Sequence, residues 1–158
     1  MAKDFYRGIP PAVSQSDGYL CWAAALESWL RAVPNRPYLL QTDLLDEAMQ
    51  AGMVAANGSL LKRGLVWIAV TFRMDMKVFG KGKALTIDFL LKRLKQKGYI
   101  YLVWNPLGSV GHAQVIWGVS PTYGTLAYMD PWMGMGYNSR TLDEYYLSTT
   151  EFVVGYPR

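Results

Sequence analysis

The only cysteine of the chain stands where it could act as a nucleophile. Cys21 lies where a loop rich in Ser, Asp and Gly, SQSDGYL, gives way to apolar, helix-forming sequence, AAALESWL. A thiolate is the reactive form of cysteine, and both a helix N-terminus and a nearby imidazolium stabilise it. Because a lone cysteine is more often a small buried hydrophobic residue, Cys21 becomes a candidate nucleophile only together with other catalytic groups.

Two residues in the C-terminal half supply such groups. His112, the only histidine, opens the strand-like segment HAQVIWG, 91 positions after Cys21. As a general base it would need a partner on its second ring nitrogen to fix its tautomer and orientation. Asp130 ends the next strand-like segment, 18 positions later, and antiparallel pairing would bring it beside His112. The sequence therefore predicts a Cys-His-Asp triad.

Gln15 lies six positions before Cys21 and could complete the site. Acyl transfer requires hydrogen-bond donors where negative charge develops on the carbonyl oxygen. The side-chain amide of Gln15 and the backbone N–H of Cys21 could be those two donors. The alternative is that Gln15 belongs to a surface loop.

Four other residues are candidates for contact with a substrate. Trp22 follows Cys21 into the helix, where packing in the core is its main expected role. Gly111 directly precedes His112. Trp132 and Met133 belong to a glycine-interrupted segment, PWMGMG, that forms either a mobile lip of the substrate groove or a packed loop.

Length and composition indicate one soluble, folded domain over residues 1–158, with 51% hydrophobic and 14% aromatic residues. One cysteine and one histidine exclude an intrachain disulfide and a Cys/His zinc cage, and we expect no cofactor and no metal. The N-terminus lacks the apolar region of a secretory signal. The longest nearly apolar run, GLVWIAVTF, is far shorter than the ~20 residues of a membrane span.

The net charge of +4 arises largely between positions 73 and 97. A charge run of this kind is usually a solvated face. The sharper alternative is a surface that binds an acidic part of the substrate. We expect no nucleic acid as partner, because the stretch lacks interleaved aromatic residues and any nucleic-acid-binding motif.

Hydrophobic periodicity and turn residues predict helices first and mostly antiparallel strands afterwards, an α+β fold. An irregular entry over 1–18 precedes a helix over 20–33. Thr42 or Asp43 would cap the second helix. The predicted helices cover 20–33, 42–51, 59–72, 86–98 and 141–147, and the predicted strands cover 75–80, 99–105, 112–120, 125–130 and 151–156.

Gln15, the five residues that follow it and Cys21-Trp22-Ala23 resemble the active-site segment of papain-like cysteine proteases. The segment GHAQVIWGVSPTYGTLAYMDPWMG, with a strand that begins at His112 and an Asp-Pro pair at its far end, is similar to the compact bacterial branch of that superfamily. This branch includes bacteriocin leader-processing peptidase domains and related effector proteases. The resemblance spans residues 13–135.

The resemblance implies a papain-like two-lobe fold, with an N-terminal helical lobe whose nucleophile helix packs against a C-terminal antiparallel sheet. It assigns Cys21, His112 and Asp130 to the triad and Gln15 to the oxyanion hole. Three features depart from plant and lysosomal papains: Tyr19-Leu20 precede the cysteine, an Asp replaces the orienting Asn, and the Cys-to-His spacing is shorter than the ~130–150 residues typical there.

The family analogy also suggests a bacterial toxin or effector used in interbacterial competition or against a host, acting on a protein substrate in the cytoplasm of a target cell. We expect no self-inhibiting propeptide, so a cognate immunity or inhibitor protein would protect the producing cell. Neither a membrane nor a nucleic acid is expected as partner.

Other functions remain open on the sequence. An amidase, transglutaminase or isopeptidase could use the same triad, and an intracellular processing peptidase could use the same fold. A binding module that has kept the scaffold is the non-enzymatic alternative. The substrate itself is not evident from the sequence.

Overall fold

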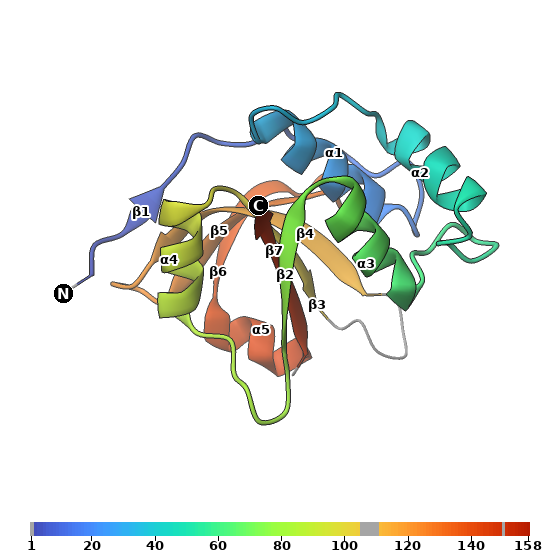
Figure 1. Ribbon diagram of the computed structural model, residues 1–158. Coiled ribbons are helices and arrows are strands. Elements are labelled where there is room, and N and C mark those ends of the chain that lie inside the picture. The colour runs from blue at the N-terminus through green and yellow to red at the C-terminus, as the bar shows by residue number, and fades with distance from the viewer. Residues whose placement is uncertain (1, 105–110, 150) are drawn as a thin grey trace.

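A seven-stranded antiparallel sheet with helices on both faces forms the fold in this computed structural model, which describes residues 2–104, 111–149 and 151–158 (Figure 1). The strands run in the order β2-β7-β3-β4-β5-β6, and the short β1 pairs with β4. The strands are β1 (Phe5–Tyr6), β2 (Met74–Phe79), β3 (Ile100–Trp104), β4 (His112–Ser120), β5 (Thr125–Asp130), β6 (Gly136–Thr141) and β7 (Phe152–Pro157).

Five helices accompany the sheet in the described residues. Three precede most of the strands, whereas α4 leads into β3 and α5 lies between β6 and β7. The predicted α+β architecture, a helical N-terminal part packed on an antiparallel sheet, is confirmed. The helices are α1 (Cys21–Ala32), α2 (Gln41–Gln50), α3 (Lys62–Thr71), α4 (Ile87–Gln96) and α5 (Leu142–Ser148).

The sheet separates two hydrophobic cores, because its central strands are apolar on both faces. Along β3, Tyr101 and Val103 join the core beneath α1, α2 and α3. Ile100, Leu102 and Trp104 point to the other side, where they pack with residues of α4 and α5. Side chains of a strand alternate between faces, so these five residues serve both cores.

Helix α1 is the best-covered helix of the fold, with every residue from Cys21 to Leu30 buried. It packs on β3 and β4 and on α2. Two hydrogen bonds tie it to the sheet: Trp29 Nε1 donates to Tyr99 O (2.9 Å), and the Tyr101 hydroxyl donates to Trp22 O (2.9 Å). The start of α1 is therefore held at a fixed place relative to β3.

Two helix starts differ from the prediction. The N-cap of α2 is Leu40 and not Thr42 or Asp43, because Asp43 reaches back from the first turn to accept the Leu40 N–H (2.9 Å). Helix α3 begins at Lys62 and not near Ser59. The Ser59 N–H and hydroxyl both bind Oδ1 of Asn57 (3.0 and 2.6 Å), a local turn that competes with a helix.

Two strands were missed by the sequence analysis. β1 lies inside the segment 1–18 that was predicted to be irregular. It contributes only two residues, which pair with β4. β6 is polar, GYNSRT, and follows β5 after a tight turn in which Met135 N donates to Trp132 O (3.0 Å). The segment that holds Trp132 and Met133 is thus the turn of a hairpin. Position 105, which the predicted strand 99–105 included, lies outside the described residues.

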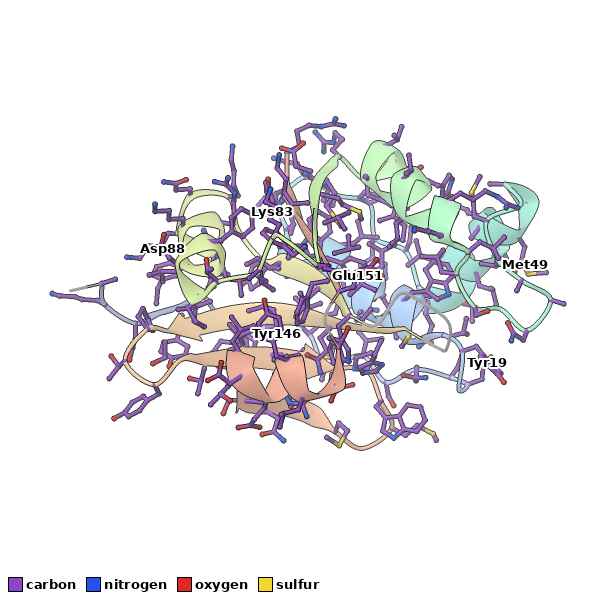
Figure 2. The ribbon with its side chains drawn as sticks, turned by 90° about the horizontal axis from the view of Figure 1, so that it is seen from below. Tyr19, Met49, Lys83, Asp88, Tyr146 and Glu151 are labelled. Atoms are coloured by element: carbon purple, nitrogen blue, oxygen red, sulfur yellow. The ribbon has the colours of Figure 1, made fainter. Side chains whose placement is uncertain are left out.

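The basic stretch maps to β2, α4 and the turn between them, where most of its lysines are exposed. In Figure 2, Asp88 on α4 and Tyr19 next to the start of α1 lie at opposite ends of the molecule. Within the described parts of the chain, no helix combines the length and the hydropathy that crossing a bilayer would require.

Candidate active site

Cys21 is the first residue of α1, and the loop before it fixes where the helix begins. The Asp17 side chain accepts the Tyr19 N–H (2.8 Å), which closes a turn just before the N-cap, Leu20. No side chain caps the helix and its first turn carries no acidic residue. The positive end of the helix dipole therefore acts on the Cys21 sulfur without an opposing charge from the helix itself.

His112 and Asp130 meet through the pairing of β4 with β5, as the sequence predicted. Nε2 of His112 lies 2.7 Å from Oδ1 of Asp130. The same carboxylate oxygen also accepts the Trp132 N–H (2.8 Å), and Oδ2 accepts Nε2 of Gln114 (2.7 Å). Asp130 is therefore held from three directions while it orients the imidazole.

The Cys21 sulfur lies against the first residues of β4. Its thiol donates to Gly111 O (3.4 Å), and it also forms a hydrogen bond with the His112 ring. Because Asp130 occupies Nε2, the ring nitrogen left for Cys21 is Nδ1. The Trp104 and His112 rings pack in a T-shaped arrangement with their centres 4.9 Å apart, which restricts rotation of the imidazole.

The surroundings of His112 favour its charged form. Burial alone would lower its pKa, but hydrogen bonds with Asp130 and Cys21 and the charges of both raise the pKa to about 9. Burial would raise the pKa of Asp130, but His112, the Trp132 N–H and Gln114 together lower it. A protonated His112 ring beside the Asp130 carboxylate is thus the stable state near neutral pH.

Gln15 is buried, and its backbone is fastened to the Asp130 loop through the hydrogen bond from Gln15 N to Pro131 O (2.8 Å). The side chain of Gln41 clamps the residues on either side of it, donating to Ser14 O (2.8 Å) and accepting the Ser16 N–H (2.9 Å).

The side-chain amide of Gln15 itself is only partly used. Nε2 donates to Asp17 O (2.7 Å), and Oε1 is buried with no hydrogen-bond partner in the described structure. Since an amide carries two N–H groups, one donor remains.

A pocket of about 380 Å³ opens beside Cys21. Apolar side chains form much of its wall, including Leu60 and Leu65, and Lys62 is the one lysine or arginine among the described residues that line it. Several of the lining residues come from the segment before α3 and from the start of that helix. The lining residues are Tyr19, Cys21, Trp22, Asn57, Ser59, Leu60, Leu61, Lys62, Leu65, Val103, Gly111, His112 and Ala113.

The four residues predicted to contact substrate fall into two groups. Trp22 and Gly111 line the pocket, and Trp22 is also tied to the loop before α3 through Nε1 and Gly58 O (3.0 Å). Trp132 and Met133 do not line it but are exposed on the β5–β6 turn, at 48% and 63%. Their contact with substrate stays a prediction.

Several residues of the site were missed by the sequence analysis. Gln114 is polar within an otherwise apolar strand and two positions after His112, a signal that could have placed it on the same face. Nothing in the sequence indicated Tyr145, whose hydroxyl binds Gln114, or the loop that contributes Leu60 to the pocket. No three metal-ligating side chains gather anywhere in the described ranges.

Comparisons with known proteins identify a family and a fold. The family model for the papain-like cysteine protease AvrRpt2 matches residues 7–150. Among solved structures, the peptidase domain of Streptococcus ComA, a bifunctional ABC transporter involved in quorum sensing, is 17% identical, with a TM-score of 0.62 over 93% of this chain and 98% of that one.

A second solved structure is a double-glycine-motif protease from an AMS/PCAT transporter in complex with the leader peptide. It is 15% identical, with a TM-score of 0.54 over 97% of this chain and 95% of that one. At these identities the two structures establish the fold. A comparison with curated protein sequences finds no match.

The titration of the single histidine tests the electrostatics of the site directly. We expect the His112 ring protons to titrate in NMR with a midpoint near pH 9. In Asp130→Asn the midpoint should fall towards the ordinary 6.5, because the negative partner is gone. A wild-type midpoint at or below 6.5 would contradict the charged pair.

The raised pKa of His112 also makes the free energy of unfolding depend on pH. Because the folded-state pKa of His112 exceeds the unfolded value, the stabilisation is complete below about pH 6.5 and is lost as pH rises through about 9. Urea unfolding of the wild type and Asp130→Asn across this range should therefore converge at alkaline pH.

Proposed function

Because the chain belongs to the papain-like cysteine protease family of AvrRpt2 and is a papain-like cysteine peptidase, we propose that it is an endopeptidase whose catalytic triad is Cys21, His112 and Asp130. The observation that carries this assignment is the position of the Cys21 sulfur. It lies at the start of α1 and is hydrogen-bonded to the His112 ring, which Asp130 orients.

The reaction would begin from a thiolate–imidazolium pair. The Cys21 thiolate attacks the carbonyl carbon of the scissile bond, and His112 gives its Nδ1 proton to the leaving amine. Water, deprotonated by the same nitrogen, then hydrolyses the thioester. Asp130 stays ionised and keeps the ring in position, and its lowered pKa supports that role.

Gln15 and the Cys21 backbone would stabilise the tetrahedral intermediate. One N–H of the Gln15 amide is taken by Asp17, and the second is available for the oxyanion. The Cys21 N–H belongs to the first turn of α1, where backbone donors have no partner within the helix. The clamp by Gln41 supports this arrangement, because it fixes the backbone from which Gln15 extends.

The substrate would be a protein or peptide that places an apolar side chain in the pocket beside Cys21. The leucines that line this pocket support an apolar occupant, and Lys62 adds a positive charge to its wall. A peptide is also the ligand in the leader-peptide complex of the AMS/PCAT protease.

For the biological role, we propose a single protease domain over residues 1–158 that acts as a bacterial toxin or effector in the cytoplasm of a target cell. A cognate immunity protein would restrain it in the producing cell. This part rests on the family analogy, and an intracellular processing peptidase is the alternative that the experiments below address.

The reactivity of Cys21 provides the central test of the triad. Iodoacetamide should alkylate the only thiol rapidly well below pH 7, and His112→Ala should abolish this fast reaction. Cys21→Ala should remove all cleavage while its thermal melting stays close to that of the wild type. A single alkylation step near the free-cysteine value of about 8.5 in both the wild type and His112→Ala would contradict the proposal.

The role of Gln15 requires a peptide substrate, which can be found by comparing new protein N-termini in a proteome treated with the active protein or with Cys21→Ala. On that peptide, Gln15→Ala should lower kcat roughly 10²- to 10³-fold, as for the loss of one oxyanion donor. Cys21 alkylation should be unaffected. Gln96→Ala, at an exposed position of α4, is the matched control, and an equal loss in both variants would refute the oxyanion role.

Expression in a bacterial cytosol tests the toxin role. The wild type should arrest growth and Cys21→Ala at the same protein level should not, because toxicity would come from cleavage. Normal growth with the active protein, shown to be active by alkylation of the recovered chain, would count against a toxin that acts on bacteria.

A further inference from the structure

A chain of buried polar side chains continues from the triad into α5. Nε2 of Gln114 donates to Oδ2 of Asp130 (2.7 Å), and the Tyr145 hydroxyl donates to Oε1 of Gln114 (2.6 Å). Gln114 and Tyr145 are 1% and 0% exposed. Neither lines the pocket beside Cys21, so neither is placed to touch a substrate there.

The direction of each hydrogen bond in this chain is fixed by chemistry. An ionised Asp130 can only accept, so Gln114 must turn its NH₂ group towards it. That orientation points the Gln114 carbonyl oxygen away from Asp130 into a buried region, where an unpaired acceptor would be costly. The Tyr145 hydroxyl supplies that donor. The flipped amide is excluded by Asp130, because it would set Oε1 against the carboxylate.

We propose that Gln114 and Tyr145 are positioning residues that hold Asp130, and through it the His112 ring, in the orientation that catalysis requires. This inference rests on the triad proposed above. Gln114 braces the carboxylate oxygen that does not touch His112, and Tyr145 braces Gln114. The helix α5, which lies outside the pocket, thus contributes to the geometry of the reaction.

The packing around Tyr145 supports a fixed role. The Trp104 ring meets both Tyr145 and His112 edge to face, with ring centres 5.1 and 4.9 Å apart, so one aromatic residue restrains both ends of the chain. Burial raises the pKa of the Tyr145 hydroxyl well above its ordinary value, which keeps it protonated and able to donate. The Arg140 guanidinium also lies over the Tyr145 ring, 4.9 Å from its centre.

Tyr145→Phe removes a single hydroxyl and leaves the packing ring in place. We expect kcat to fall roughly 3- to 10-fold with KM unchanged, and the NMR midpoint of His112 to fall by roughly 0.5 to 1 unit, in line with the loss of one hydrogen bond. Tyr146→Phe is the matched control: the same hydroxyl is lost from the next residue of α5 (labelled in Figure 2), where it donates to Leu85 O (2.9 Å).

Gln114→Glu adds a readout that a purely structural role would not move. Beside Asp130 the introduced carboxyl has a raised pKa, and in its neutral form it can still donate to Asp130 and accept from Tyr145. Activity relative to the wild type should therefore be highest at acidic pH and fall as pH rises and the carboxyl ionises. The titratable or charged groups around this position are His112, Asp130, Tyr128, Arg140, Glu144 and Tyr145.

The outcomes separate this inference from the triad proposal. A lower kcat and a lower His112 midpoint in Tyr145→Phe, absent in Tyr146→Phe, support the positioning roles. Equal values in both variants, with a fast-alkylating wild type, overturn those roles and leave the triad intact. A wild type without the low-pH reactivity of Cys21 overturns both. If thermal melting shows that Tyr145→Phe does not fold, the pH profile of Gln114→Glu decides, and a profile parallel to the wild type refutes the inference.

Discussion

The hydrogen bond between His112 Nε2 and Asp130 Oδ1 is the interaction on which the rest of the site depends. It uses one ring nitrogen, leaves the other for Cys21, and sets the charge of the ring. It exists because β4 and β5 are antiparallel neighbours whose register, with Val115 opposite Met129, brings the start of β4 beside the end of β5. Burying a charged group costs free energy unless the charge is paired. The Asp130 carboxylate meets this condition through His112, Gln114 and the Trp132 N–H.

The sheet also decides how the two halves of the site meet. α1 lies on one face of the sheet, whereas Trp104 and Tyr145 belong to the core on the other face. Cys21 and His112 come together at the strand ends, where both faces are within reach. The hydrogen bonds from Trp29 and Tyr101 fix α1 against β3, so the sulfur cannot shift without disturbing the core.

The N-terminal segment closes the site from the side of Gln15. It is tied to the Asp130 loop through Pro131 and to α2 through the Gln41 side chain, and Ser28 of α1 donates to Pro11 O (2.6 Å). Each of these bonds uses the backbone of the segment and none uses the side-chain amide of Gln15. A stretch with almost no regular structure is thus tied to the Asp130 loop, to α1 and to α2.

The sequence by itself determined the α+β class, a helix that begins within one residue of Cys21 and the pairing of His112 with Asp130, because helix-forming runs, strand alternation and hairpins are local signals. The spacing of Gln15 and Cys21 could be read in the same way. Only the tertiary structure placed Gln114 against Asp130, brought Tyr145 to it from α5 and formed the pocket wall around Leu60. Those contacts join segments that are far apart in the sequence, and no local pattern in either segment predicts the other. The contacts arise from how the helices and the loop pack on the sheet.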